Sequence, residues 1–363
     1  MPTLKRPKKK KVATPPTVSK EIGELRQDMI TGKWSIIATG RAKRPHNFAT
    51  DRKKPATLPK YKEGCPFCNL ADFPQEPVVL RLPDDPDQWE IHIFGNKYPA
   101  FTPKEDFRSW NVGPYRAMES VGYHELMATR WHNEAEPLMT KRQLALELEA
   151  LVLRYRQLKA KPSVNYIQII NNHGPEAGGS IEHPHHQIFT VPVLPDDIQD
   201  LLQGAERFAQ QHGQEGFAIM LDFERQSRER IVYENELFTA FCPYASRVPF
   251  EVWIMPNDPE PFFENVGPKE REQLADVMQQ VLGRLYTGLN DPPYNYYVLS
   301  APCDETGFVC NKESFKHFRW HIQVTPRLNI WGGFEIGTGL EINTALPEES
   351  AAFLRDQDIP TRV

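Results

Sequence analysis

Two stretches of this chain carry the same order of apolar segments, and this repetition constrains the fold more than any other feature. In each stretch two strand-like runs precede a helix-like segment, and two more strand-like runs follow it. The first set is Trp89–Phe94, Gly122–Met127, Met139–Leu158, Tyr166–Gly174 and a strand from His183, and the second is Ile231–Phe241, Phe250–Pro256, Leu274–Leu285, Tyr294–Leu299 and Trp320–Pro326. The repeated order predicts a duplicated α+β fold with antiparallel sheets and crossover helices.

The predicted boundaries divide the chain into a basic tail at 1–20, a first half at 21–195 and a second half at 196–363. The tail contains Lys5, Arg6 and an unbroken run from Lys8 to Lys11. We expect it to be disordered, because it has almost nothing apolar to bury. A nuclear address or a polyanion-binding arm is the alternative to a solvated tail without a specific role.

Composition excludes several classes of protein. With 363 residues, 40% of them hydrophobic and 11% aromatic, the chain can bury a large core. Its 48 acidic and 43 basic residues give a net charge of −5, which provides no general attraction to nucleic acid. No apolar run is long enough to span a bilayer and no signal peptide is evident, so we expect a cytoplasmic protein without a membrane partner.

The most reactive segment runs from Gly178 to Pro192 and combines small residues, three histidines and a glutamine. Gly178, Gly179 and Ser180 allow a phosphate to approach the backbone, where N–H groups and the serine hydroxyl can donate hydrogen bonds. An imidazole is a nucleophile at neutral pH and can form a phosphoramidate. A histidine beside a phosphate cradle therefore indicates covalent nucleotidyl transfer. The alternative is a histidine-rich surface turn or a metal clip.

Cysteine spacing indicates a metal site. Cys65 and Cys68 form a Cys-x-x-Cys pair, which allows two thiolates to share one tetrahedral ion. The odd total of five cysteines in a chain of this length fits a reducing compartment better than a disulfide framework. A redox pair is the alternative, although the thioredoxin-like βαβ context is missing. The other ligands of a metal site must come from elsewhere in the chain.

The run His183-Pro-His185-His-Gln187, followed by Ile-Phe-x-x-Pro, resembles the galactose-1-phosphate uridylyltransferases, the transferase branch of the histidine-triad superfamily. The resemblance implies two histidine-triad-like halves, with His185 as the nucleophile. Gln187 stands where hydrolases of the superfamily carry a third histidine, so it favours transfer. The resemblance also implies that His183 and His132 complete a Cys₂His₂ zinc site with the two cysteines.

The same resemblance implies substrate-binding residues. Arg41 and Arg44, within Arg-Ala-Lys-Arg-Pro, match a run that binds nucleotide phosphates and reaches the site of a neighbouring subunit, which implies a homodimer. Asn172 matches a nucleotide-contacting asparagine. Asn96 matches a segment that touches base and ribose, although a turn asparagine that caps its own backbone is equally consistent with the sequence.

A glycine-rich segment at 332–343 is the candidate sugar-binding element. Glycines let backbone approach a ligand and a carboxylate can accept two sugar hydroxyls, although a run of tight β-turns also fits the composition. The resemblance implies that Glu335 holds the hexose. Glu341 stands where well-known members carry a glutamine, and the Gly-Phe-Glu-Ile-Gly-Thr-Gly run also resembles plant relatives that transfer adenylyl groups.

The predicted function is exchange of UMP between UDP-glucose and galactose 1-phosphate through a nucleotidyl-histidine, with Ser180 and Gln187 stabilising phosphoryl charge. Adenylyl transfer between ADP-glucose and phosphate is the rival reaction, and a zinc-stabilised binding module without catalysis is the rival class. We expect one zinc per chain. His317 and His321 have no thiolate or identified carboxylate partner in the sequence, so a structural role is expected for them, and a second metal near them is the alternative.

Overall fold

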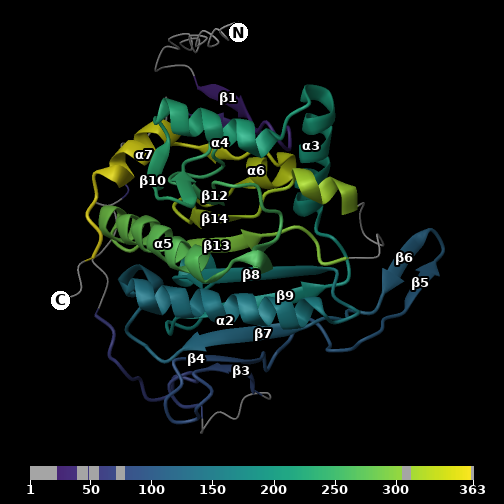
Figure 1. Cartoon of the computed structure of the whole chain (residues 1–363), viewed down its shortest axis with the longest axis vertical. Coiled ribbons are helices and arrows are strands. Elements are labelled where there is room, and N and C mark those ends of the chain that lie inside the picture. Colours follow the sequence, from purple (N-terminus) through teal and green to yellow (C-terminus); the bar gives the residue numbers. More distant parts are fainter. Residues whose placement is uncertain (1–22, 39–47, 49–56, 71–77, 305–311, 361–363) are drawn as a thin grey trace, which may run out of the picture.

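One continuous antiparallel sheet of ten strands forms the centre of the protein, as a computed structural model that describes residues 23–38, 48, 57–70, 78–304 and 312–360 shows (Figure 1). The first half contributes β3 (Val78–Leu82), β4 (Ile91–Gly95), β7 (His124–Thr129), β8 (Tyr166–His173) and β9 (His185–Val191). The second half contributes β10 (Ile231–Glu234), β11 (Phe238–Phe241), β12 (Val252–Pro256), β13 (Tyr294–Leu299) and β14 (His321–Pro326). The α+β class and the antiparallel pairing that the sequence predicts are confirmed.

The two halves have the same strand order. Across the sheet the order is β10-β11-β12-β14-β13-β8-β9-β7-β4-β3. In each half the fifth strand in sequence therefore lies between the third and the fourth: β9 lies between β7 and β8, and β14 lies between β12 and β13. The halves join where β8 pairs with β13, with Asn172 opposite Asn295. Asn172, a predicted site residue, is thus directly adjacent to a strand of the second half.

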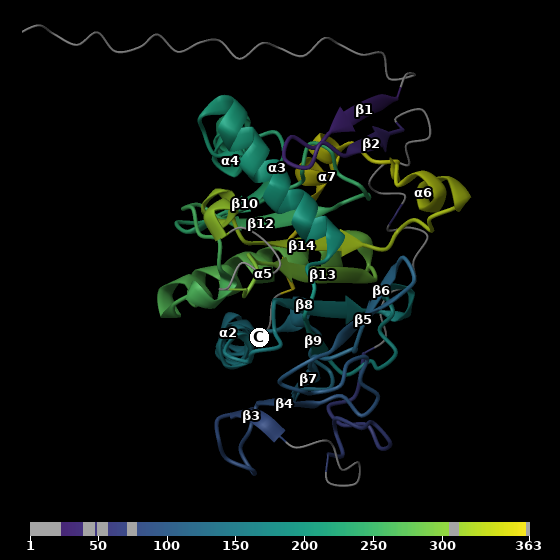
Figure 2. The same cartoon turned by 90° about the vertical axis from the view of Figure 1, so that its right-hand side faces the viewer.

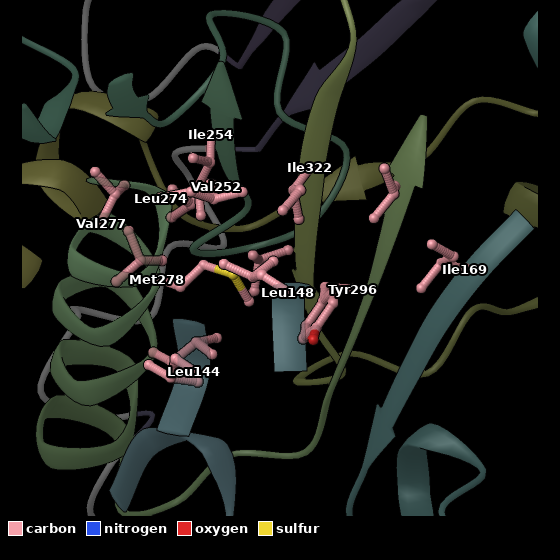
Figure 3. Close-up of a cluster of buried hydrophobic side chains, with 14 of the residues drawn as sticks. Leu144, Leu148, Ile169, Val252, Ile254, Leu274, Val277, Met278, Tyr296 and Ile322 are labelled. Carbon is pink, nitrogen blue, oxygen red and sulfur yellow. The ribbon is translucent and has the colours of Figure 1, made fainter. Parts of the chain in front are cut away.

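Two long helices, α2 (Lys141–Lys159) and α5 (Pro268–Leu289), cover one face of the sheet side by side (Figure 1). The start of α2 is fixed by a capping box between Thr140 and Gln143, and α5 begins with Pro268 at its first turn. Their apolar stripes meet the sheet in the main core (Figure 3); labelled members include Leu144, Leu148, Met278, Ile254 and Ile322.

The other face is covered over the second half by α3 (Asp196–His212) and α4 (Gly216–Ser227). Leu201 and Phe217 of these helices pack in a separate apolar cluster with Tyr166, Trp253 and Leu299. Neighbouring residues of the same strands, such as Ile167 and Val298, belong to the main core, as alternation along a strand requires. Over the first half this face carries His185 and Gln187 of β9, whereas Ile188 of the same strand packs in the main core.

Smaller elements surround the sheet. They are β1 (Glu24–Gln27), β2 (Trp34–Ile37) and β15 (Ile342–Asn343) in a three-stranded sheet, the hairpin β5 (Ser109–Val112) and β6 (Tyr115–Met118), the short helices η2 (Glu136–Leu138), η3 (Pro175–Ala177), η4 (Phe263–Asn265) and η5 (Lys312–His317), and the C-terminal helices α6 (Gly333–Thr338) and α7 (Pro347–Arg355). None of the helices in the described ranges combines the length and apolarity needed to cross a membrane.

The glycine-rich segment differs from a run of β-turns because it contains α6. Glu335 lies at the third position of this helix, and its carboxylate accepts a hydrogen bond from the N–H of Gly332 at 2.9 Å. This cap satisfies one of the free N–H groups at the helix start. The helix ends at Thr338, and the residue after it, Gly339, has a left-handed φ of 70°.

Candidate active site

His185 begins β9 and is held in one tautomer. Its Nδ1 lies 2.8 Å from the carbonyl oxygen of His183, an acceptor, so Nδ1 carries the proton and donates it. The lone pair therefore lies on Nε2. Burial lowers the pKa of His185 below its ordinary value, which keeps the ring neutral. A neutral imidazole with an oriented Nε2 lone pair is a prepared nucleophile.

A Cys/His cluster lies immediately behind this histidine. The ligand atoms of Cys65, Cys68, His132 and His183 all lie within 4.8 Å of one another. The Sγ of Cys68 is 3.3 Å from His132 Nδ1 and 3.5 Å from His183 Nδ1. A tetrahedral zinc with bonds of about 2.0–2.3 Å separates its ligand atoms by roughly 3.3–3.8 Å. The four predicted residues therefore have a spacing that suits a metal such as zinc.

His183 is also oriented by its other nitrogen. Its Nε2 is 2.7 Å from the carbonyl oxygen of Thr129, so Nε2–H donates and Nδ1 is left for the metal. Phe67, between the two cysteines, places its ring 5.6 Å from His183 and 5.2 Å from His185. The cluster thus supports the backbone carbonyl that orients the His185 ring.

The predicted phosphate loop follows η3. Gly178 has a φ of 83°, and Gly179 packs so tightly that an added Cβ would lie 2.7 Å from the carbonyl oxygen of Asn172. Asn295 of β13 donates from Nδ2 to Asn172 Oδ1 and to the carbonyl oxygen of Ala177, both at 2.7 Å. Because the Asn172 amide oxygen accepts the first of these bonds, the NH₂ group of Asn172 is left to donate to a ligand. Asn295 comes from the second half and is a residue that the sequence did not indicate.

Gln187 is oriented by a second unpredicted residue, His124 of β7. The N–H of Ala100 donates to His124 Nδ1 at 3.2 Å, so the ring proton lies on Nε2. That proton is directed to Gln187 Oε1 at 3.0 Å, while the ring stacks on Phe189 with centroids 4.0 Å apart. Gln187 therefore uses its carbonyl oxygen internally and keeps its NH₂ group for a ligand.

A cavity of about 380 Å³ opens beside Asn172 and Asn295. It also contains Arg247, Arg327 and Trp331 from the second half. The guanidinium of Arg247 donates to the Tyr297 hydroxyl at 2.6 Å, and Arg327 lies over the Trp331 ring at 5.3 Å. Guanidinium groups, amides and an aromatic ring form a lining suited to an anionic, hydroxyl-rich ligand.

Comparison with known proteins agrees with this geometry. The family described as "Galactose-1-phosphate uridyl transferase, N-terminal domain" matches residues 16–195. ADP-glucose phosphorylase of Arabidopsis thaliana is 30% identical over 343 residues, which cover 94% of this chain and 94% of the relative. The chain belongs to the galactose-1-phosphate uridylyltransferase family. The predicted family is therefore confirmed, and with it membership of the histidine-triad superfamily and nucleotidyl transfer as the class of reaction.

Two further relatives extend the comparison. Galactose-1-phosphate uridylyltransferase of Thermotoga maritima is also 30% identical, over 93% of this chain and 99% of the relative. The crystal structure of Arabidopsis ADP-glucose phosphorylase with bound ADP-glucose has a TM-score of 0.77 and 26% identity, covering 93% of this chain and 100% of that one. Equal identity to the two named activities leaves the donor nucleotide to experiment.

The remaining predicted site residues are placed less directly. Arg41 and Arg44 lie outside the described residues. Asn96 accepts the N–H of Tyr98 at 2.9 Å, so it caps its own turn, and its Nδ2 is 3.0 Å from His124 Nε2. Asn96 therefore lies next to the residue that orients Gln187, and it also caps its own turn, which is the alternative role that the sequence left open.

The two glutamates of the sugar segment belong to the second half. Glu335 lies on α6, which projects sideways beside that half of the sheet (Figure 2). Glu341 follows α6, and the charge of the nearby Arg247 opposes the burial that raises the Glu341 pKa. Among the described residues, no hydrogen bond joins either glutamate to His185, Gln187 or Asn172 in the single chain.

The second half of this family member contains a copy of the His-x-Gln part of the β9 motif. His321 and Gln323 on β14 have the spacing of His185 and Gln187 on β9, and His321 Nδ1 is 2.9 Å from the carbonyl oxygen of Arg319. Neither potential metal group among the described residues includes His317 or His321. Instead, His321 Nε2 lies 3.0 Å from Gln323 Nε2, which fits the expected structural role.

Proposed function

We propose that His185 attacks the α-phosphorus of a nucleotide sugar and carries the nucleotidyl group between two substrates. The observation that carries this proposal is the hydrogen bond from His185 Nδ1 to the carbonyl oxygen of His183, which leaves the Nε2 lone pair oriented. In the first step the Nε2–phosphorus bond forms and the bond to the sugar-phosphate oxygen breaks. In the second step an incoming phosphate oxygen attacks and the nitrogen–phosphorus bond breaks. Neither step requires a strong base, because each leaving group is weakly basic.

The charge that develops on the phosphoryl oxygens is assigned to donors around the loop. Ser180 donates its hydroxyl, Gln187 donates the NH₂ group that its bond to His124 leaves free, and Asn172 donates its NH₂ group toward the loop. Arg41 and Arg44 are proposed to bind the nucleotide phosphates through their guanidinium groups. Asn96 is proposed to contact the nucleoside.

The metal site is proposed to be structural. Cys65, Cys68, His132 and His183 supply two thiolates and two imidazoles, the donor set of closed zinc sites. Zinc there supplies no step of the reaction and stabilises the loop that bears the nucleophile. His183 links the two functions, because its Nδ1 is a proposed ligand and its carbonyl oxygen orients His185.

The sugar pocket is proposed to require two copies of the chain. Glu335 and Glu341 are assigned to the hexose, yet α6 projects from its own subunit. Apolar side chains next to them are exposed: Ile330 is 99% and Ile336 is 74% exposed. An apolar projection of this kind is suited to burial against a partner. We therefore assign the chain to a homodimer in which each α6 approaches the partner's nucleotide.

Two substrate pairs are consistent with this site. The first is UDP-glucose with galactose 1-phosphate, and the Thermotoga maritima relative named for that activity matches over 93% of the chain. The second is ADP-glucose with inorganic phosphate, and it is favoured by the likeness to the Arabidopsis structure that holds ADP-glucose. The chemistry on His185 is the same in both, so one experiment tests the mechanism and separates the donors.

The test is to incubate the full-length protein with UDP-glucose or ADP-glucose labelled in the nucleotide, without an acceptor. We expect a label on His185 that is labile in acid and stable in base, as a phosphoramidate is. His185→Gly abolishes it, whereas His173→Gln, a control whose imidazole binds Asp291 at 2.6 Å, retains it. The donor that labels faster identifies the nucleotide. Binding of a nucleotide sugar without any label refutes the covalent mechanism and favours the non-catalytic module.

A further inference from the structure

A second group of metal-ligating side chains lies on the opposite face of β9 from the nucleophile. It consists of His186 on β9, Glu136 on η2 and Glu147 on α2, and one ligand atom from each lies within 4.8 Å of the others. All three side chains are nearly inaccessible, with exposures of 1%, 2% and 2%. This group shares no residue with the Cys/His cluster, and nucleotidyl transfer does not use it.

The group is rich in oxygen ligands, and only some of its polar atoms have hydrogen-bond partners. The Tyr296 hydroxyl of β13 donates to Glu136 Oε1 at 2.5 Å. His186 Nε2 contacts the same hydroxyl and lies 3.1 Å from the same carboxylate oxygen. The buried atoms Glu136 Oε2, Glu147 Oε1 and His186 Nδ1 have no hydrogen-bond partner. A buried polar atom without a partner is costly, and several in one place indicate a missing ligand.

The charge of the group is also unbalanced. Two carboxylates lie next to each other, and the pKa of Glu147 is raised by burial and by the charge of Glu136. The buried tyrosines Tyr294 and Tyr296 next to the group also have raised pKa values, for which burial and then Glu136 are the largest causes. No lysine or arginine contributes to any of these shifts. Neutrality therefore requires either bound protons or a cation.

We propose that Glu136, Glu147 and His186 bind a divalent transition-metal ion. Two carboxylates cancel the charge of one divalent ion, and an imidazole ligand beside them favours Mn²⁺, Fe²⁺ or Zn²⁺ over Mg²⁺ and Ca²⁺, which prefer oxygen ligands alone. Bonds of about 2.1 Å at right angles separate ligand atoms by about 3.0 Å, close to the 3.1 Å between His186 Nε2 and Glu136 Oε1.

The ion links elements that the backbone leaves far apart in sequence. It joins η2 and α2 to β9, and through Tyr296 to β13 of the second half. His186 is the residue directly after His185, so the ion supports the nucleophile strand from behind. The Cys/His site supports the same strand from its loop, where His183 lies. The inference is independent of the reaction on His185, because it concerns the other face of the sheet.

The experiment counts metals in the full-length protein and does not depend on activity. Wild type, Glu147→Gln and Cys65→Ser are purified, freed of loosely bound metal, loaded with Mn²⁺, Fe²⁺ or Zn²⁺ in turn and analysed by mass spectrometry. We expect about two ions per wild-type chain and about one in each variant. In a cobalt-loaded sample, thiolate-to-cobalt absorption reports the Cys site, so it persists in Glu147→Gln and is lost in Cys65→Ser.

A single outcome overturns the proposal without depending on any variant of the glutamates. If wild type holds at most one ion with every metal and Cys65→Ser holds none, the buried group is a proton-sharing network and not a metal site. If a folded His186→Gln variant binds as much metal as wild type, the buried group is likewise not a metal site. Labelling of His185 is measured separately, so a failed metal count leaves the proposed transfer reaction intact.

Discussion

Gly179→Ala is the substitution that tests the phosphate loop most directly. A Cβ at this position would lie 2.7 Å from the carbonyl oxygen of Asn172 and 2.9 Å from that of Gly174. Both neighbours are backbone atoms at the end of β8, so neither can turn aside as a flexible side chain does. The loop that contains Ser180 must move instead.

The size of the movement follows from the contact distances. Ordinary carbon contacts begin at 3.4 Å, so the separation must grow by 3.4 − 2.7, about 0.7 Å. Overpacking of this kind costs about 1–3 kcal/mol of stability. A displacement of 1 Å in a reacting geometry costs roughly 100-fold in rate. We therefore expect the rate of His185 labelling to fall by roughly 10- to 100-fold.

The matched comparison is Gly178→Ala in the same loop. Its φ of 83° makes alanine strained, yet the nearest atom to the added Cβ is Asn172 Nδ2 at 4.0 Å. We expect a stability loss of about 1–2 kcal/mol and a much smaller loss of labelling. Single-turnover labelling and urea unfolding of both variants measure the two effects. Full labelling by Gly179→Ala would show that this loop does not hold the phosphate.

Four more changes test separate parts of the site. His124→Phe keeps a ring for stacking but removes the hydrogen bond donated to Gln187. The kcat should fall about tenfold, which corresponds to the loss of one hydrogen bond. An unchanged kcat would show that His124 does not orient Gln187. Cys65→Ser should lose the zinc at its own site and lower Tm, and unchanged zinc content contradicts that ligand assignment. Glu335→Gln preserves the helix cap but weakens a sugar-hydroxyl acceptor, so the sugar-phosphate KM should rise far more than nucleotide binding weakens; equal losses argue against a sugar contact. Burial lowers the pKa of His321 from an ordinary 6.5 to about 4, so the unfolded state takes up a proton before the folded state does as the pH falls. The stability that the neutral ring provides is therefore full above pH 6.5 and is lost as the pH drops toward 4, by up to about 3 kcal/mol. Urea unfolding at pH 7 and pH 5 should show a smaller difference in stability for His321→Gln than for wild type.

Local patterns were sufficient to predict much of the fold. The apolar runs that predict β4, β7, β8 and β9 are confirmed, and each strand directs alternate apolar side chains into the helix-covered core: Ile93, Met127, Ile169 and Ile188. The predicted helix from Met139 to Leu158 is α2. The four predicted metal ligands converge although 118 positions separate Cys65 from His183. Family resemblance supplied that convergence, since spacing alone identifies only the two cysteines.

The missed features depend on pairing across strands. Asn295 acts on Asn172 from a strand 123 positions away, and His124 reaches Gln187 across the β7–β9 pair. Neither residue stands in a recognisable motif, so only the register of the sheet brings them to the site. α6 was missed for a different reason. Glycines disfavour a helix, and here the side chain of Glu335 compensates by capping the first turn.

The comparison of the two halves explains why a single histidine is the proposed nucleophile. His321 has the strand position and the Nδ1–carbonyl hydrogen bond of His185, so backbone geometry alone does not distinguish them. Their surroundings do. The His321 ring is fully buried, with Trp253 stacked at 5.0 Å and Phe217 of α4 at 5.8 Å. Its Nε2 also contacts Gln323, whereas Gln187 is drawn away from His185 by His124. The proposed role of His185 therefore depends on surroundings that draw Gln187 away from it as much as on the histidine itself.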